Sequence, residues 1–125
     1  MNKLLNIASR ILMAQIFLIS GFGKIMGYAG TQAYMAKMGV SGELLPVVIA
    51  VEVGGGLALL FGFQTRIVAL GLAAFSIITA LIFHTNFTDQ AQLVNFLKNL
   101  AMAGGLLMFV QYGAGSLSID NRSRA

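Results

Sequence analysis

Four long apolar segments dominate this chain of 125 residues. They cover Leu4–Ile25, Leu44–Phe63, Ile67–Phe83 and Val94–Tyr112. A helix needs about 20 apolar residues to cross the ~30 Å hydrocarbon core of a bilayer, and each segment is close to that length. The apolar runs are continuous rather than alternating, which argues against a membrane β-barrel. We therefore expect an all-α polytopic membrane protein, with residues 1–125 forming one integral membrane domain.

The composition agrees with a membrane location. Hydrophobic residues make up 58% of the chain and charged residues only 10%, whereas roughly 25% charged residues is typical of soluble domains. The basic residues are scattered and form no continuous face, so we expect no nucleic-acid partner. The chain has no cysteine, which removes disulfides, thiolate nucleophiles and cysteine-ligated iron–sulfur clusters. Any redox chemistry must then involve a bound molecule or a partner.

The connections between the segments predict the topology. The links over residues 64–66 and 84–93 are short, so the last three segments must be antiparallel neighbours, as in an up-down-up-down four-helix bundle. The longest connection, Met26–Glu43, contains a short helical pattern over Thr31–Met38, with Thr31 as its expected cap and Gly39 as its stop. We expect this helix to lie in the membrane interface, either as a simple connector or as a lid.

The basic residues favour one orientation. If the N-terminus is cytoplasmic, five basic residues fall on the cytoplasmic side and three on the other side, which fits the positive-inside rule. The cytoplasmic set is Lys3, Arg10, Arg66, Arg122 and Arg124, and the opposite set is Lys24, Lys37 and Lys98. We expect a bacterial inner-membrane protein with both termini in the cytoplasm.

Glu52 is the only ionisable residue within Leu44–Phe63. A charge at this depth costs at least ~2.5–3.5 kcal/mol, so such residues normally face a bundle interior and have a partner. We expect Glu52 within hydrogen-bond reach of Lys24, Lys98 or Asn99. Three interpretations remain open: a structural ion pair between helices, a proton-accepting or ligand-binding carboxylate, and a neutral, protonated side chain.

Further polar residues lie at the level of Glu52 or above it. With the N-terminus inside, Glu52 is ~12 Å below the outer end of its helix at ~1.5 Å per residue. Each neighbour also has an ordinary interpretation: a lysine that reaches the interface, a histidine at a helix end, or an amide that links helices. Arg10 lies near the inner boundary instead. The candidate ligand-binding residues are Glu52, Lys24, His84, Lys98, Asn99 and Arg10, and one histidine with one glutamate gives no expected metal site.

Small residues recur every fourth position at Ala50, Gly54, Ala58 and Gly62. A small-xxx-small ridge lets two helices approach closely. We expect it to form a helix–helix contact within the bundle; the alternative is an interface in a homo-oligomer.

Several short motifs, in order along the chain, resemble the DoxX family of small four-span membrane proteins. They include Ser20–Ile25, Val51–Gly55, Phe61–Arg66, Lys98–Leu100 and the tail Gly113–Asp120. The family is similar to a subunit of a membrane thiosulfate:quinone oxidoreductase, and some members are associated with membrane oxidoreductase assemblies. The resemblance carries no catalytic role to any residue. The positions that match are Arg10, Lys24, Glu52, Arg66, His84 and Asn99.

Three functions fit these patterns. The leading hypothesis is a quinone-linked or otherwise redox-associated accessory subunit, with a quinone as candidate cofactor and membrane oxidoreductase subunits as partners besides the lipid bilayer. Its polar site would combine donors on lysine, histidine or amide groups with Glu52 as proton acceptor. The alternatives are a transporter of small solutes or lipids coupled to protonation of Glu52, and a structural scaffold. The substrate stays open.

Overall fold

The computed structural model describes residues 3–121, and this part of the chain is helical with no strand. Four helical stretches within it are long and apolar enough to cross a membrane, which confirms the predicted fold class. The elements in chain order are α1 (Lys3–Met26), α2 (Tyr28–Lys37), η1 (Gly42–Leu44), α3 (Leu45–Ile49), η2 (Ala50–Gly54), α4 (Gly55–Phe61), α5 (Thr65–Phe83) and α6 (Gln90–Tyr112).

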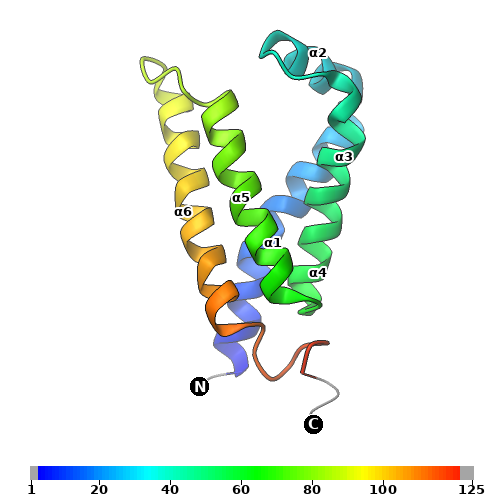
Figure 1. The fold of residues 1–125 in the computed structure, drawn as a ribbon, viewed down its shortest axis with the longest axis vertical. Coiled ribbons are helices and arrows are strands. Elements are labelled where there is room, and N and C mark those ends of the chain that lie inside the picture. The colour runs from blue at the N-terminus through cyan, green and yellow to red at the C-terminus, as the bar shows by residue number, and fades with distance from the viewer. Residues whose placement is uncertain (1–2, 122–125) are drawn as a thin grey trace.

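The helices form two antiparallel pairs. Helix α1 packs along α3, η2 and α4, while α5 packs along α6. Figure 1 shows that the pairs approach each other at the end where α1 begins and diverge towards the end where α2 lies. We call these the terminal end and the lid end. A buried cluster that includes Phe17, Leu59, Leu72 and Leu106 joins the two pairs, so the hydrophobic core sits on the side of the molecule away from the lid.

The second membrane-spanning stretch is not one regular α-helix. It begins with the short 3₁₀ turn η1, has Pro46 in the first turn of α3, and changes to a π-helical turn, η2, around Glu52. A π turn holds one more residue than an α turn and is frequent at functional sites. The expected small-residue ridge does not form a continuous seam inside the protein, because Ala50 and Gly54 are exposed while Gly62 is buried. Gly55 and Gly56 instead pack closely against Leu72 and Leu18.

Helix α2 lies at the end where the two pairs diverge (Figure 1), and we call it the lid for its position there. It begins at Tyr28, three residues before the expected cap, so Thr31 lies inside the helix and its hydroxyl donates to the Gly27 carbonyl. The expected stop is confirmed, since Gly39 has a φ of 84°, a conformation that suits glycine. On α2, Met35 is buried, and the Tyr34 ring stacks on Phe83 with centroids 5.6 Å apart. The lid therefore contacts the end of α5 across the gap between the two pairs.

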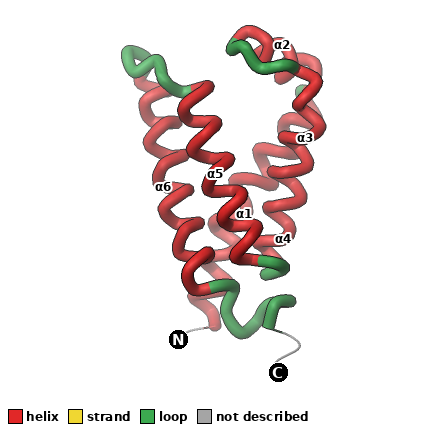
Figure 2. Tube along the Cα trace, in the orientation of Figure 1, coloured by secondary structure: helices red, strands yellow, loops and turns green. Residues whose placement is uncertain are grey.

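Polar contacts fix the terminal end. The C-terminal segment passes beneath the α4–α5 turn (Figure 2), where the Asp120 carboxylate accepts hydrogen bonds from the backbone N–H groups of Gln64 and Thr65 at 2.6 and 2.9 Å. This cap explains why α5 begins at Thr65 instead of Ile67. Similarly, Asp89 caps α6, which begins four residues before the predicted Val94.

Candidate functional site

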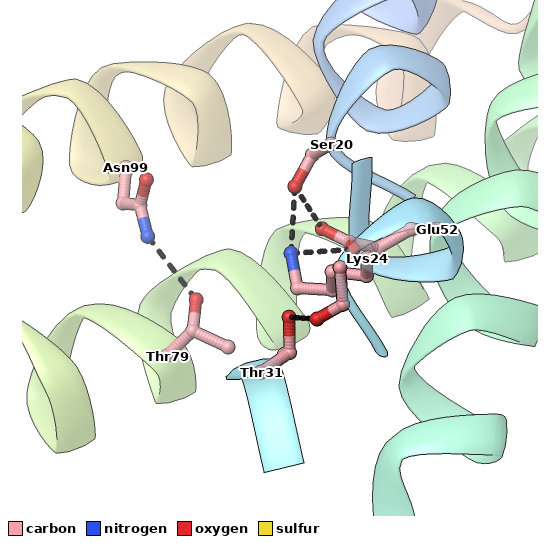
Figure 3. A network of polar contacts seen from close by, with 7 residues as sticks. Ser20, Lys24, Thr31, Glu52, Thr79 and Asn99 are labelled. Carbon is pink, nitrogen blue, oxygen red and sulfur yellow. Dashed lines mark hydrogen bonds and ion pairs between the residues drawn. The ribbon is translucent and has the colours of Figure 1, made fainter. Parts of the chain in front are cut away.

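Glu52 lies in a closed ring of three polar side chains. The Lys24 ammonium is 2.8 Å from Glu52 Oε1 and donates to Ser20 Oγ at 2.7 Å, and the Ser20 hydroxyl donates to Glu52 Oε2 at 3.0 Å. Figure 3 shows the three side chains converging from α1 and η2. The Glu52 residue is only 5% exposed. The expected contact with Lys24 is therefore confirmed, and both carboxylate oxygens of Glu52 have a partner.

Local helix geometry brings these three groups together. Ser20 and Lys24 are four residues apart and so share one face of α1. A Cβ atom at Gly21 would lie 2.6 Å from Val53 Cγ2 and 3.2 Å from Glu52 Cβ. The glycine thus lets α1 approach the π turn closely enough for the Ser20 and Lys24 side chains to reach Glu52.

A second polar group lies on the α5–α6 pair. Asn99 is buried, and its amide nitrogen donates to the Ser76 carbonyl at 3.2 Å and to Thr79 Oγ1 at 3.1 Å. Figure 3 shows Asn99 and Thr79 turned toward one another. Asn99 therefore links α5 to α6 and does not contact Glu52 directly.

A cavity of about 640 Å³ separates the two polar groups. Such a volume is within the 300–1,000 Å³ of most small-molecule sites. Its wall is mostly apolar, and Tyr34 and Met35 of the lid form part of it. Five of the six candidate residues line it: Lys24, Glu52, His84, Lys98 and Asn99. The arrangement suits a ligand with an apolar body and polar atoms that reach either wall.

His84 and Lys98 line the cavity without satisfying their own hydrogen-bonding groups. His84 Nδ1 is buried and has no hydrogen-bond partner. Burial, together with the nearby charge of Lys98, lowers the pKa of His84 below its usual value. The structure gives Lys98 no hydrogen bond or ion pair within residues 3–121. The Lys98 ammonium is therefore free to bind a ligand.

Arg10 is not part of this site. It lies at the terminal end, where it is buried and its guanidinium donates to the carbonyls of Leu60 and Leu117. Burial alone would raise the pKa of Asp120. The hydrogen bonds from Thr65 and Gln64, together with the charge of Arg10, outweigh burial and lower that pKa. The surroundings of Arg10 are those of a residue that fixes the C-terminal segment to the α4–α5 turn.

The sequence reasoning missed several polar residues of the cavity. Ser20, Thr79 and Gln15 line it beside the expected ones. Ser20 could have been predicted from the sequence, because it lies one helical turn before Lys24 on the same face. Thr79 could not have been predicted in this way, since the hydroxyl of a threonine within a membrane helix commonly forms a hydrogen bond to the backbone of its own helix.

Comparison with known proteins identifies the family. The family model described as DoxX matches residues 5–85, which is most of the described chain from α1 through α5. The chain belongs to the DoxX family. This confirms the resemblance suggested by the sequence motifs, and α6 with Lys98 and Asn99 lies beyond the matched residues.

The chain is also similar to three known proteins. It is 52% identical to "Inner membrane protein YqjF" of Escherichia coli over 91% of this chain and 88% of the relative. It is 36% identical to "Inner membrane protein YphA" of the same organism, over 97% and 91%. It is 34% identical to "Putative oxidoreductase CatD" of Bacillus subtilis, over 66% and 63%. No solved structure matches the chain.

Proposed function

We propose that this DoxX-family protein is an inner-membrane, redox-associated accessory subunit that binds a quinone in the cavity between its two helix pairs. The observation that carries the proposal is the apolar cavity with polar groups on both walls. A quinone presents carbonyl oxygens on opposite sides of an apolar ring, so it matches a site with donors on both sides. Two relatives support this function, since one is named an inner membrane protein and the other a putative oxidoreductase.

The cavity residues divide by chemistry. Lys98 on the α5–α6 wall and Lys24 on the α1 wall would each hold one carbonyl oxygen of a bound quinone. The Lys24 ammonium has three N–H donors and directs two of them at Glu52 and Ser20, so one is left for the ligand. Glu52, held in place by Lys24 and Ser20, would accept protons and pass them on to the quinone, which takes up two protons with the two electrons that reduce it. The quinone supplies the electron-accepting chemistry, while the residues of this chain position it and exclude water. Because the chain has no cysteine, a partner subunit would deliver the electrons.

The proposal includes an orientation. Helix α1 begins and the C-terminal segment ends at the same end of the bundle (Figure 1). The described basic residues divide equally between the two ends, and Arg122 and Arg124, which tip the sequence count, lie outside the described residues. The cytoplasmic placement of the terminal end therefore rests on the sequence count alone. The lid then faces the opposite side of the membrane, and the cavity lies in the outer half of the bundle.

Quinone titration of the purified protein tests the function. We expect a quinone without a tail to bind to the protein in detergent. Lys98→Met should weaken this binding about tenfold, because it removes one charge-assisted hydrogen bond. Lys37→Met is the matched control, because Lys37 lies on α2 outside the cavity wall. Calorimetry or quinone-dependent thermal stabilisation would measure the affinities. Absence of binding to the wild-type protein, or equal loss in both variants, would refute the proposal.

One observation favours proton-coupled transport as a second candidate. Glu52 lies in a π turn beneath a lid, and intramembrane carboxylates are common in proton-coupled transporters. Uptake of a solute into proteoliposomes that stops in Glu52→Gln and continues in Glu43→Gln, without any quinone affinity, would establish transport instead.

A further inference from the structure

A second hollow lies outside the cavity. It is a groove of about 730 Å³ between α1 and α6, two helices that barely touch along their length. Its wall includes Leu12, Met13, Ala101 and Met108 and is mostly apolar. Because it extends from Asn6 towards Ile16 on α1, it follows that helix for ~15 Å at 1.5 Å per residue. The groove thus lies at the depth of the acyl chains.

The groove and the cavity adjoin. Gln15, Ile16, Lys98 and Met102 line both of them. The two hollows therefore share these four side chains as a common wall, and a ligand that occupied both would have to pass between them.

Two polar residues mark this junction. Gln15 and Lys98 are both exposed, and the structure gives neither a hydrogen bond or an ion pair within residues 3–121. Gln15 lies 12 residues after Lys3, so it is ~18 Å along α1 and near the middle of the membrane. A polar side chain facing hydrocarbon is costly. Its presence is explained if a polar ligand group passes it.

We propose that the groove between α1 and α6 binds the apolar tail of the ligand whose polar head occupies the cavity, and that the head reaches the cavity from the bilayer between Gln15 and Lys98. This inference rests on the proposed function and adds the ligand class: a long-tailed, lipid-soluble molecule. An ordinary phospholipid chain or a second copy of the protein would need only an apolar surface. The polar junction and its continuity with the cavity favour the tailed ligand over both.

The test compares decylubiquinone with its tail-less parent quinone in the full-length protein. In the wild type we expect the tailed quinone to bind about tenfold more tightly at equal concentration in the detergent phase, the effect of the van der Waals contacts of its tail with the groove wall. Ala101→Phe fills the groove and should bring the ratio close to one while leaving the tail-less quinone unaffected. Gly104→Phe is the control, because it adds the same ring to α6 at an exposed position that does not line the groove.

The outcomes separate the two proposals. The groove assignment is wrong and the cavity assignment stands if the tail-less quinone binds but the ratio of the two affinities is close to one in the wild type. The same conclusion follows if the tail-less quinone binds and the wild-type ratio is unchanged in Ala101→Phe. If the tail-less quinone does not bind, both are wrong. A wild-type dimer that Ala101→Phe converts to monomers, with unchanged quinone affinities, would assign the groove to a second copy and overturn the proposal.

A second measurement does not depend on a variant. A quinone with a photoreactive group at the end of its tail should label the wild-type protein within residues 6–16 or 101–113, the stretches that line the groove. Labelling confined to other helices would overturn the proposal.

Discussion

At the residue scale, the Lys24–Glu52 pair combines a buried carboxylate with a partly exposed ammonium. The Glu52 side chain is 7% exposed and the Lys24 side chain 28%. Removing one partner of a buried pair is strongly destabilising because the other charge remains, whereas replacing both by neutral groups is often tolerated. The Ser20 hydroxyl donates a further hydrogen bond to the carboxylate. Glu52 is therefore fixed in position by a hydrogen bond as well as by its ion pair with Lys24.

A double-mutant cycle measures this coupling. Glu52→Gln should lower the free energy of unfolding by about 1–3 kcal/mol, less than for a fully buried pair because Lys24 can turn to the interface. Glu52→Gln combined with Lys24→Met should cost less than the sum of the single changes. Glu43→Gln, at an exposed position, is the control for loss of charge alone. Additive effects in a denaturant titration would show that the pair is not coupled.

The sequence identified Glu52 as the centre of the site but left three partners open. Lys24, Lys98 and Asn99 are all within the same half of the membrane, and helical periodicity does not fix how two helices are rotated relative to each other. Lys24 reaches Glu52 because Gly21 lets α1 approach η2 closely. That contact is tertiary, so the sequence pattern alone could not reveal it.

At the element scale, the π turn and the glycine opposite it form one structural unit. Helix α1 touches η2 at Gly21, where any side chain would collide with Val53. The turn also directs Glu52 inward and leaves Ala50 and Gly54 exposed. The close contact between α1 and η2 therefore determines the position of the carboxylate.

Alanine substitutions on α1 test this contact. Gly21→Ala should destabilise the protein by about 1–3 kcal/mol, the usual cost of overpacking, and should also disturb Glu52. Gly23→Ala meets nothing within 4 Å and should stabilise the helix by about 0.5–1 kcal/mol. Thermal unfolding in detergent measures both. Equal effects of the two substitutions would contradict a tight α1–η2 contact.

The elements themselves were largely predictable from the sequence. All four predicted spans are present in the structure. The prediction differs from the structure only at the helix ends and in the helical stretch that contains Glu52. Helix α5 begins earlier than predicted because Asp120, far away in the chain, caps it. The π turn was missed because a continuous apolar run gives no sign of a single extra residue per turn.

At the scale of the whole molecule, the two helix pairs diverge toward the lid end and the cavity lies between them. The short links made the antiparallel order predictable, but the angle between the pairs depends on which side chains pack at the terminal end. The groove was not foreseen for the same reason. Composition predicted how much apolar surface the chain has, and only the packing shows which part of it adjoins a polar cavity.

Mass spectrometry of the small molecules that accompany the purified protein tests the central claim most directly. The cavity should retain a quinone through mild detergent extraction, at close to one per chain in the wild type and in Lys37→Met, and at a much lower level in Lys98→Met. If wild-type protein is purified from quinone-rich membranes and carries no quinone, this result would contradict the account.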